Sequence, residues 1–241
     1  METVIFSVSF AVIAFLIFLS FKYFDRRLTF AFGLLFAAYL GLDDLVTGLP
    51  SSSAAFSFVG AEWNWSGKIY SLLLSVVVIL GLGIKPKALG LTLSQRHLKT
   101  SVIMLFLLIL WGLSLGFIFK PSVPSAETLA FQAVMPGLSE ELAYRGIGPA
   151  LLFGLIRGKE STHDVPWAVV FITAVIFGIW HGLSYSASGF SFDSMSALFP
   201  FIGSIAGGWL RFRSGSLLFP ILAHSFANIA FHLSAYWANP A

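Results

Sequence analysis

Long apolar runs recur along the whole chain and are separated by short polar stretches. Eight of them are long enough to cross about 30 Å of hydrocarbon as a helix. They cover residues 3–21, 28–47, 67–84, 100–119, 127–157, 165–183, 193–211 and 216–238. Within each run the apolar residues are continuous rather than alternating, which favours helices over strands. The pattern predicts an all-α fold: a polytopic membrane bundle of about eight transmembrane helices.

Composition strengthens the membrane assignment and excludes several other classes of protein. The 241 residues are 57% hydrophobic and only 10% charged, whereas soluble domains carry about 25% charged residues. Too few polar side chains are present to cover a soluble globule, and disorder or nucleic-acid binding is excluded on the same grounds. There are no cysteines, so disulfides and thiolate chemistry are excluded. We expect one integral membrane domain, residues 1–241, whose surroundings are the lipid bilayer.

Positive charge gathers in alternate loops. Eleven of the fourteen Lys and Arg lie in the loops of one side. Lys68 and Lys120 are assigned to the loops of the opposite side, together with Asp43, Asp44 and four other acidic residues. These eleven are Lys22, Arg26, Arg27, Lys85, Lys87, Arg96, Lys99, Arg157, Lys159, Arg211 and Arg213. The positive-inside rule places them in the cytoplasm and both termini outside. We expect a multi-pass protein of a prokaryotic plasma membrane.

The first apolar run is expected to remain as a helix. A cleaved signal peptide carries positive charge before its apolar segment, but here only Glu2 precedes it and the nearest basic residue, Lys22, follows it. Residues 48–66 are expected to form the longest outer loop, with Trp63 and Trp65 at the membrane interface. Small-xxx-small pairs at 112/116, 178/182 and 203/207 predict close helix packing.

Three ionisable residues stand together in the fifth run. Ionisable groups inside a bilayer are costly and therefore demand a reason. Glu141 and Arg145 are four residues apart, so they can pair on one helix face. Glu140 points about 100° away and is left for another partner. Upstream, Pro136 and Gly137 predict a break in the helix beside a watery cavity, or else a packing kink.

Further polar residues occur in the sixth and eighth runs. His181 ends the sixth, and His224 and Asn228 share one face of the eighth because they are four residues apart. With Glu140 they provide a carboxylate, two imidazoles and an amide, the groups needed to activate a water. We expect a shared polar site inside the bundle. His232 lies on the same stripe and is expected nearer the outer interface.

These residues resemble the three signature motifs of one family. They are Glu-Glu-x-x-x-Arg at 140–145, Phe-x-x-x-His at 177–181 and His-x-x-x-Asn at 224–228. In this order, inside predicted spans, they resemble the CAAX protease and bacteriocin-processing (Abi) family, which includes the type II CAAX prenyl endopeptidases. The resemblance covers residues from about 85 to 238.

The resemblance implies an intramembrane endopeptidase of the glutamic type. Glu140 and His181 would activate a water for peptide hydrolysis, and His224 and Asn228 would stabilise the oxyanion. Glu141, Arg145 and Phe177 would complete the motifs, with Glu141 and Arg145 as a structural pair that places Glu140. The expected partner is a protein or peptide substrate at the membrane, and no cofactor is expected.

Two other functions remain open from the residues alone. Glu140, His181 and His224 could supply three ligands to a catalytic zinc, although the sequence has no His-Glu-x-x-His and Asn228 would have no part as a ligand. A membrane immunity or binding protein, or a proton-coupled transporter, could also use intramembrane Glu and His. A single polar cluster without an inverted repeat argues against a transporter.

Overall fold

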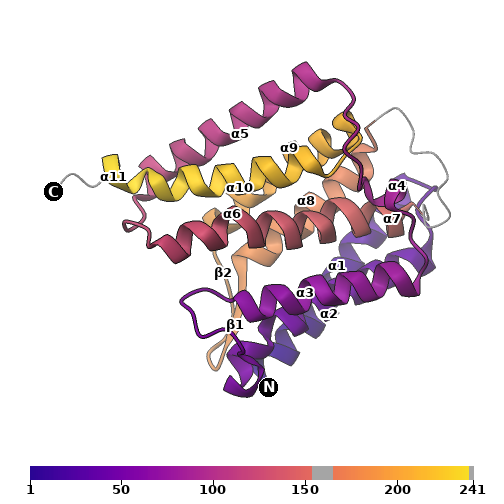
Figure 1. Ribbon diagram of the computed structural model, residues 1–241. Helices are drawn as coiled ribbons and strands as arrows, with labels where there is room; N and C mark the ends of the chain where they lie inside the picture. The colour runs from indigo at the N-terminus through magenta and orange to yellow at the C-terminus, as the bar shows by residue number, and fades with distance from the viewer. Residues whose placement is uncertain (154–164, 239–241) are drawn as a thin grey trace.

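A computed structural model describes residues 1–153 and 165–238 of the protein (Figure 1). Arg157, Lys159 and the end of the fifth predicted span lie outside these residues. The helices are α1 (Glu2–Phe24), α2 (Phe30–Ser52), α3 (Trp65–Gly81), α4 (Pro86–Leu89), α5 (Leu98–Phe119), α6 (Ala126–Glu141), α7 (Gly148–Leu152), α8 (Trp167–Gly182), α9 (Ser194–Ser214), α10 (Leu218–Leu233) and α11 (Ala235–Ala238). A 3-10 turn η1 (Ala54–Phe56), a π-helical turn η2 (Leu142–Ile147) and strands β1 (Leu183–Ser186) and β2 (Gly189–Phe192) complete them.

Over the described residues, every predicted apolar run coincides with a helical segment, so the all-α membrane bundle is confirmed. Four helices in this part of the chain are long and apolar enough to cross a membrane: α1, α2, α5, and α10 together with α11. Helices α3 and α8 are apolar but shorter. In lipid a helix satisfies its own backbone hydrogen bonds, which explains why these apolar runs become helices.

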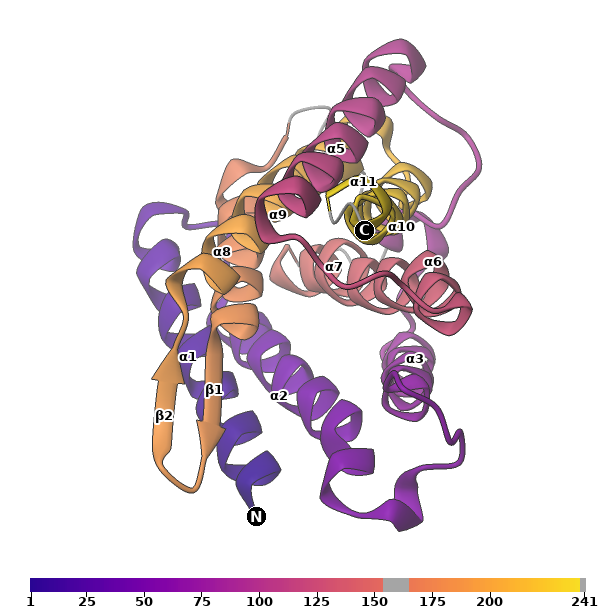
Figure 2. The same cartoon turned by 90° about the vertical axis from the view of Figure 1, so that its left-hand side faces the viewer.

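The helices form two groups joined by a central pair. Helices α5, α9 and α10 lie on one side, α1, α2 and α3 on the other, and α6 and α8 between them (Figures 1 and 2). The most extensive helix contacts are α8 with α9, α5 with α10, α1 with α2, and α6 with α10. Segments that are far apart in sequence are thereby brought to the middle of the bundle.

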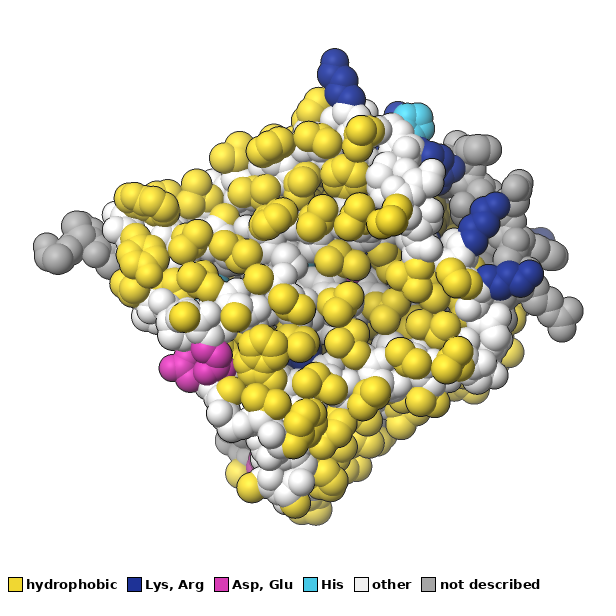
Figure 3. All heavy atoms as spheres, in the orientation of Figure 1, with side chains coloured by type: hydrophobic (Ala, Val, Ile, Leu, Met, Phe, Trp, Pro, Cys, Tyr) yellow, Lys and Arg dark blue, Asp and Glu magenta, His cyan; other side chains and the backbone are white. Residues whose placement is uncertain are grey.

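The surface has the charge pattern of a membrane protein. On the face in Figure 3, hydrophobic side chains cover the width of the molecule, with Lys and Arg at one edge and acidic side chains at the opposite edge. The long helices leave large apolar side chains exposed, among them Val8, Leu107, Leu110 and Ile118. Soluble monomers rarely expose apolar surface on this scale, so this surface is suited to lipid.

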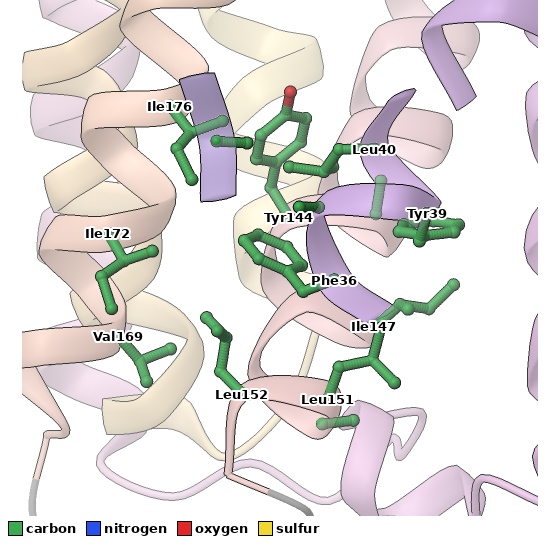
Figure 4. Close-up of a cluster of buried hydrophobic side chains, with 14 of the residues drawn as sticks. Phe36, Tyr39, Leu40, Tyr144, Ile147, Leu151, Leu152, Val169, Ile172 and Ile176 are labelled. Atoms are coloured by element: carbon green, nitrogen blue, oxygen red, sulfur yellow. The ribbon is translucent and has the colours of Figure 1, made fainter. Parts of the chain in front are cut away.

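A buried apolar cluster fixes the turn after α6. Phe36 and Leu40 from α2 meet Ile147 from η2, Leu151 from α7 and Ile172 from α8, all less than 2% exposed (Figure 4). Fully burying such side chains contributes about 1.5–3 kcal/mol each. The cluster therefore holds the end of α6 and the η2 turn firmly against α8.

Helix α6 is continuous through Pro136, so the predicted break at Pro136 and Gly137 is wrong. The irregular backbone comes later, as the π-helical turn η2. Gly137 instead packs against α10, where an added Cβ would meet the Ser225 hydroxyl and lie 2.9 Å from the Ile221 carbonyl oxygen. The packing alternative for this pair is therefore the correct one.

Three further expectations about loops are wrong. Helix α2 continues to Ser52 and α3 begins at Trp65, so the loop between them is shorter than the predicted loop 48–66. Lys68, Asp43 and Asp44 lie within helices rather than in outer loops, because each finds a polar partner inside the bundle. Arg211 lies in the last turn of α9, buried, and donates to the Ala88 carbonyl.

A small hairpin, which the sequence analysis did not predict, joins α8 to α9. Strands β1 and β2 pair antiparallel, from Leu183 opposite Phe192 to Ser186 opposite Gly189. Gly189 turns the chain with φ of 100°, a conformation that glycine adopts readily. The alternation is too short to distinguish from the apolar runs beside it, which explains why it was not predicted.

The predicted glycine packing holds for two of the three pairs. Gly112 and Gly116 of α5 face backbone atoms of α10, and Gly178 and Gly182 of α8 face backbone atoms of α9. Gly203 differs, because an added Cβ there would meet nothing within 4 Å. It lines a cavity rather than a helix contact.

We expect Gly112→Ala to destabilise the bundle and Gly203→Ala to leave it unchanged. An added methyl group at Gly112 would overlap the Ala227 carbonyl, and overpacking of this kind costs about 1–3 kcal/mol. Thermal unfolding in detergent measures both variants against the wild type. Equal unfolding midpoints for the two variants would contradict the α5–α10 contact.

Candidate active site

A cavity of about 740 Å³ lies in the middle of the bundle, between the two helix groups. Its walls come from α3, α5, α6, α8, α9 and α10. All seven motif residues predicted from the sequence line it: Glu140, Glu141, Arg145, Phe177, His181, His224 and Asn228. Residues from three separate predicted spans thus line one cavity inside the bundle.

Glu140 ends α6 and is 8% exposed. Its Oε1 accepts a hydrogen bond from the Lys68 Nζ at 2.6 Å. Its Oε2 is buried and has no hydrogen-bond partner among the described residues, and it lies 3.8 Å from the Nε2 of His224. One carboxylate oxygen is thus fixed by a cation, and the other is left without a hydrogen-bond partner among the described residues.

Glu141 forms the predicted pair with Arg145, at 3.0 Å between Oε1 and NH1. The same oxygen accepts a hydrogen bond of 2.8 Å from the Nδ1 of His224. Arg145 lies in the π-helical turn and places its guanidinium 4.8 Å from the centre of the Phe177 ring. Glu141 therefore links two motifs, because it holds both Arg145 and His224.

His181 lies in the last turn of α8, on the cavity wall. Its Nδ1 donates to the Phe177 carbonyl oxygen at 2.9 Å, because a carbonyl can only accept. This bond leaves the Nε2 unprotonated in the neutral ring and free to accept a proton or a hydrogen bond. The rings of Phe177 and Trp180 pack against the imidazole, with centroids 4.4 and 4.9 Å away.

Asn228 lies one turn beyond His224 on α10 and also faces the cavity. Its Nδ2 donates to the Oε1 of Gln132 at 2.8 Å. An amide nitrogen carries two hydrogens, so one remains for another acceptor. Gln132, from α6, is a neighbour that the motifs did not predict.

A second polar network continues behind Glu140. Lys68 lies in the first turns of α3 and is 8% exposed, and its Nζ is 5.3 Å from the centre of the Trp180 ring. The indole Nε1 of Trp180 donates to Asp44 at 2.7 Å, and Asp44 also accepts from Ser7 at 2.6 Å. Asp43 accepts from Ser71 at 2.6 Å. A lysine inside a predicted span was the signal for this network, since such residues are rarely passive.

The end of the cavity away from Arg145 is aromatic. Trp63 stacks on Phe131 with centroids 5.1 Å apart and meets the edge of His232 at 6.0 Å. Thr47 and Asn64 border the same region. It lies toward the loop that carries Glu62, whose backbone amide donates to Glu127. His232 thus lies at this aromatic end of the cavity.

Residues 1–153 and 165–238 contain no group of three or more His, Asp or Glu side chains arranged to hold a metal ion. The cavity groups are instead joined in pairs: Glu140 with Lys68, Glu141 with Arg145 and His224, and Asn228 with Gln132. What this arrangement offers chemically is one open carboxylate oxygen, two imidazoles and amide hydrogens in a largely apolar cavity.

Comparison with known families agrees with the motifs. Residues 122–230 match the family model described as type II CAAX prenyl endopeptidase Rce1-like. Curated proteins and solved structures give no match. The matched range includes all three motif segments and the helices that carry them, α6, α8 and α10. Residues 122–230 are therefore similar to the Rce1-like family of type II CAAX prenyl endopeptidases, which supports the resemblance that the three motifs carry.

Proposed function

We propose that the protein is an intramembrane glutamic endopeptidase that hydrolyses a peptide bond within this cavity. The observation that carries the proposal is the meeting of Glu140, His181, His224 and Asn228 in one cavity of a CAAX-type protease fold. Ionisable groups are costly in a bilayer, so their gathering around one cavity indicates a function there. Glu140 and His181 activate the water, and His224 and Asn228 stabilise the oxyanion.

Glu140 acts as the base. Its Oε2 has no hydrogen bond to described residues, and Glu140 lines the cavity. A general base must reach the proton that it removes, directly or through one water. His181 supports it through the free Nε2, which can accept a second hydrogen bond from the same water. The proton taken by Glu140 then passes to the leaving amine.

His224 must carry two protons to donate to an oxyanion. Its Nδ1–H already donates to Glu141, so the Nε2 offers a hydrogen only in the imidazolium form. The Glu141 carboxylate is in direct contact with the His224 Nδ1, at 2.8 Å. Asn228 adds the amide hydrogen that Gln132 leaves unused. Glu141 therefore acts in this scheme through His224 as well as through Arg145.

We expect the substrate to approach from the extracytoplasmic side. The cavity extends toward the loop that carries Glu62, whereas the described basic residues gather at the other end, where Lys85, Lys87 and Arg213 lie. The positive-inside rule assigns the basic end to the cytoplasm. An apolar, aromatic entrance suits a peptide segment that emerges from the bilayer.

The topology can be tested with reporter fusions in a bacterial plasma membrane. Fusions after Ala241 should give an extracytoplasmic signal, and fusions near Arg157 a cytoplasmic one, because of the asymmetry of Lys and Arg between the loops. A cytoplasmic signal at Ala241 would contradict the proposed orientation. The two fusion sites control for each other, since a single miscounted helix would change only one signal.

Peptide cleavage by the purified protein tests the activity itself. Two probes are compared: a farnesylated peptide that ends in a CAAX sequence, and the same peptide without the isoprenoid. In water enriched with oxygen-18, each cleavage should place one heavy oxygen in the new carboxyl terminus, because water is the attacking group. Cleavage of neither probe, nor of apolar transmembrane peptides, would speak for the binding or transport alternatives.

A further inference from the structure

Lys68 lies outside all three motifs and outside the residues matched by the family model. It comes from α3, which lies on the other side of α6 from α10 (Figure 2). Its ammonium is nevertheless the cation hydrogen-bonded to Glu140, at 2.6 Å. A residue of a different helix group thus makes the shortest contact to the proposed base.

We infer that Lys68 is a positioning residue for the proposed reaction: it holds the Glu140 carboxylate ionised and directs one oxygen into the cavity. Lys68 occupies Oε1, so the oxygen left for a water is Oε2. Oε2 is also the oxygen that lies 3.8 Å from the Nε2 of His224. The lysine therefore selects which carboxylate oxygen meets the reacting groups.

Burial makes the charge of Lys68 important. Glu140 and Lys68 are each 8% exposed, and an isolated carboxylate in such a site is strongly disfavoured relative to its neutral form. A protonated Glu140 cannot accept a proton from water. A cation in direct contact offsets the loss of hydration and keeps the carboxylate available as a base.

Other groups around the pair lie farther from Glu140: the Nε2 of His224 is 3.8 Å from Oε2, whereas the Lys68 Nζ is 2.6 Å from Oε1. Arg145 is paired with Glu141, and His224 donates to Glu141. Asp43 and Asp44 are acidic, so they do not favour an ionised Glu140. The ionisable groups around the pair are Asp43 and Asp44 from α2, Glu141 from α6, Tyr144 and Arg145 from η2, His181 from α8 and His224 from α10.

Lys68 is itself held in place. Its Nζ lies over the Trp180 ring, and the Trp180 indole is fixed by its hydrogen bond to Asp44. Trp180 also packs against His181. The Trp180 ring therefore supports the Lys68 ammonium in a fixed position relative to the Glu140 carboxylate, as expected of a positioning residue.

The inference rests on the proposed function, and its test compares Lys68→Met, Lys68→Gln and Lys68→Arg on a peptide that the wild-type protein cleaves. Lys68→Met should lower kcat near neutral pH by about tenfold or more with KM within about twofold. Its activity should return at higher pH, with the acidic limb of the profile moved upward by about one pH unit or more. Lys68→Gln keeps a hydrogen-bond donor without the charge and should show the same shift. It replaces Lys68→Met as the test variant if Lys68→Met does not fold.

Lys68→Arg should restore most of the activity and the wild-type pH profile, because it keeps the charge. Lys120→Met is the matched control, since Lys120 is an exposed lysine beyond the end of α5. A wild-type kcat and pH profile in Lys68→Met or Lys68→Gln would overturn the inference, and so would a loss of kcat without a shift. Glu140→Gln is measured in parallel: an active Glu140→Gln would overturn the proposed function itself.

Discussion

Replacing Glu140 with Gln is expected to lower peptide cleavage by about 10²–10⁴-fold while the protein stays folded. Gln keeps the size of the side chain and an oxygen that can accept from Lys68, but it cannot take a proton from water. The rate of cleavage of a peptide by purified protein, with the thermal unfolding midpoint as a check on folding, measures the effect.

Two other carboxylates provide the comparison. Glu2→Gln changes an exposed residue in the first turn of α1 and should retain full activity. Glu141→Gln should mainly lower the unfolding midpoint, because Glu141 holds both Arg145 and His224. Full activity in Glu140→Gln, together with a folded and inactive Glu141→Gln, would contradict the assignment of Glu140 as the base.

Asn228→Ala is expected to lower kcat by about 10²–10³-fold with little change in KM. Loss of one oxyanion donor has this magnitude, and a contact made only in the transition state appears in kcat. Steady-state kinetics on the same peptide separates the two constants.

Gln132→Ala is the control for position. It removes the contact with Asn228 but leaves the Asn228 amide, so a clearly smaller loss is expected. If Gln132→Ala and Asn228→Ala were equally impaired, the effect of Asn228 would be one of packing, and its assignment as a donor would be contradicted.

The helices could be predicted from the sequence because a bilayer leaves the backbone few alternatives to a helix. Their ends were harder to predict. Helix α2 continues to Ser52, beyond the predicted run 28–47, and Asp43 and Asp44 inside it are partnered by Ser71 and Trp180. Pro136 suggested a break that tertiary packing of Gly137 against α10 overrides.

The site could be predicted as far as its motifs reach. Glu140, His181, His224 and Asn228 were recognised from spacing, and they line one cavity. Lys68 and Gln132 could not be assigned in the same way, because their relation to Glu140 and Asn228 depends on how α3, α6 and α10 approach one another. A hydrogen bond between residues 72 positions apart leaves no spacing signal in one sequence.

The central claim is that Glu140, assisted by His181, activates the water without a metal. The most direct test is to measure peptide cleavage by purified protein before and after treatment with a strong chelator, together with elemental analysis of the same sample. The glutamic mechanism predicts unchanged cleavage and no stoichiometric zinc. Stoichiometric zinc, with activity lost on chelation and restored by added zinc, would contradict it.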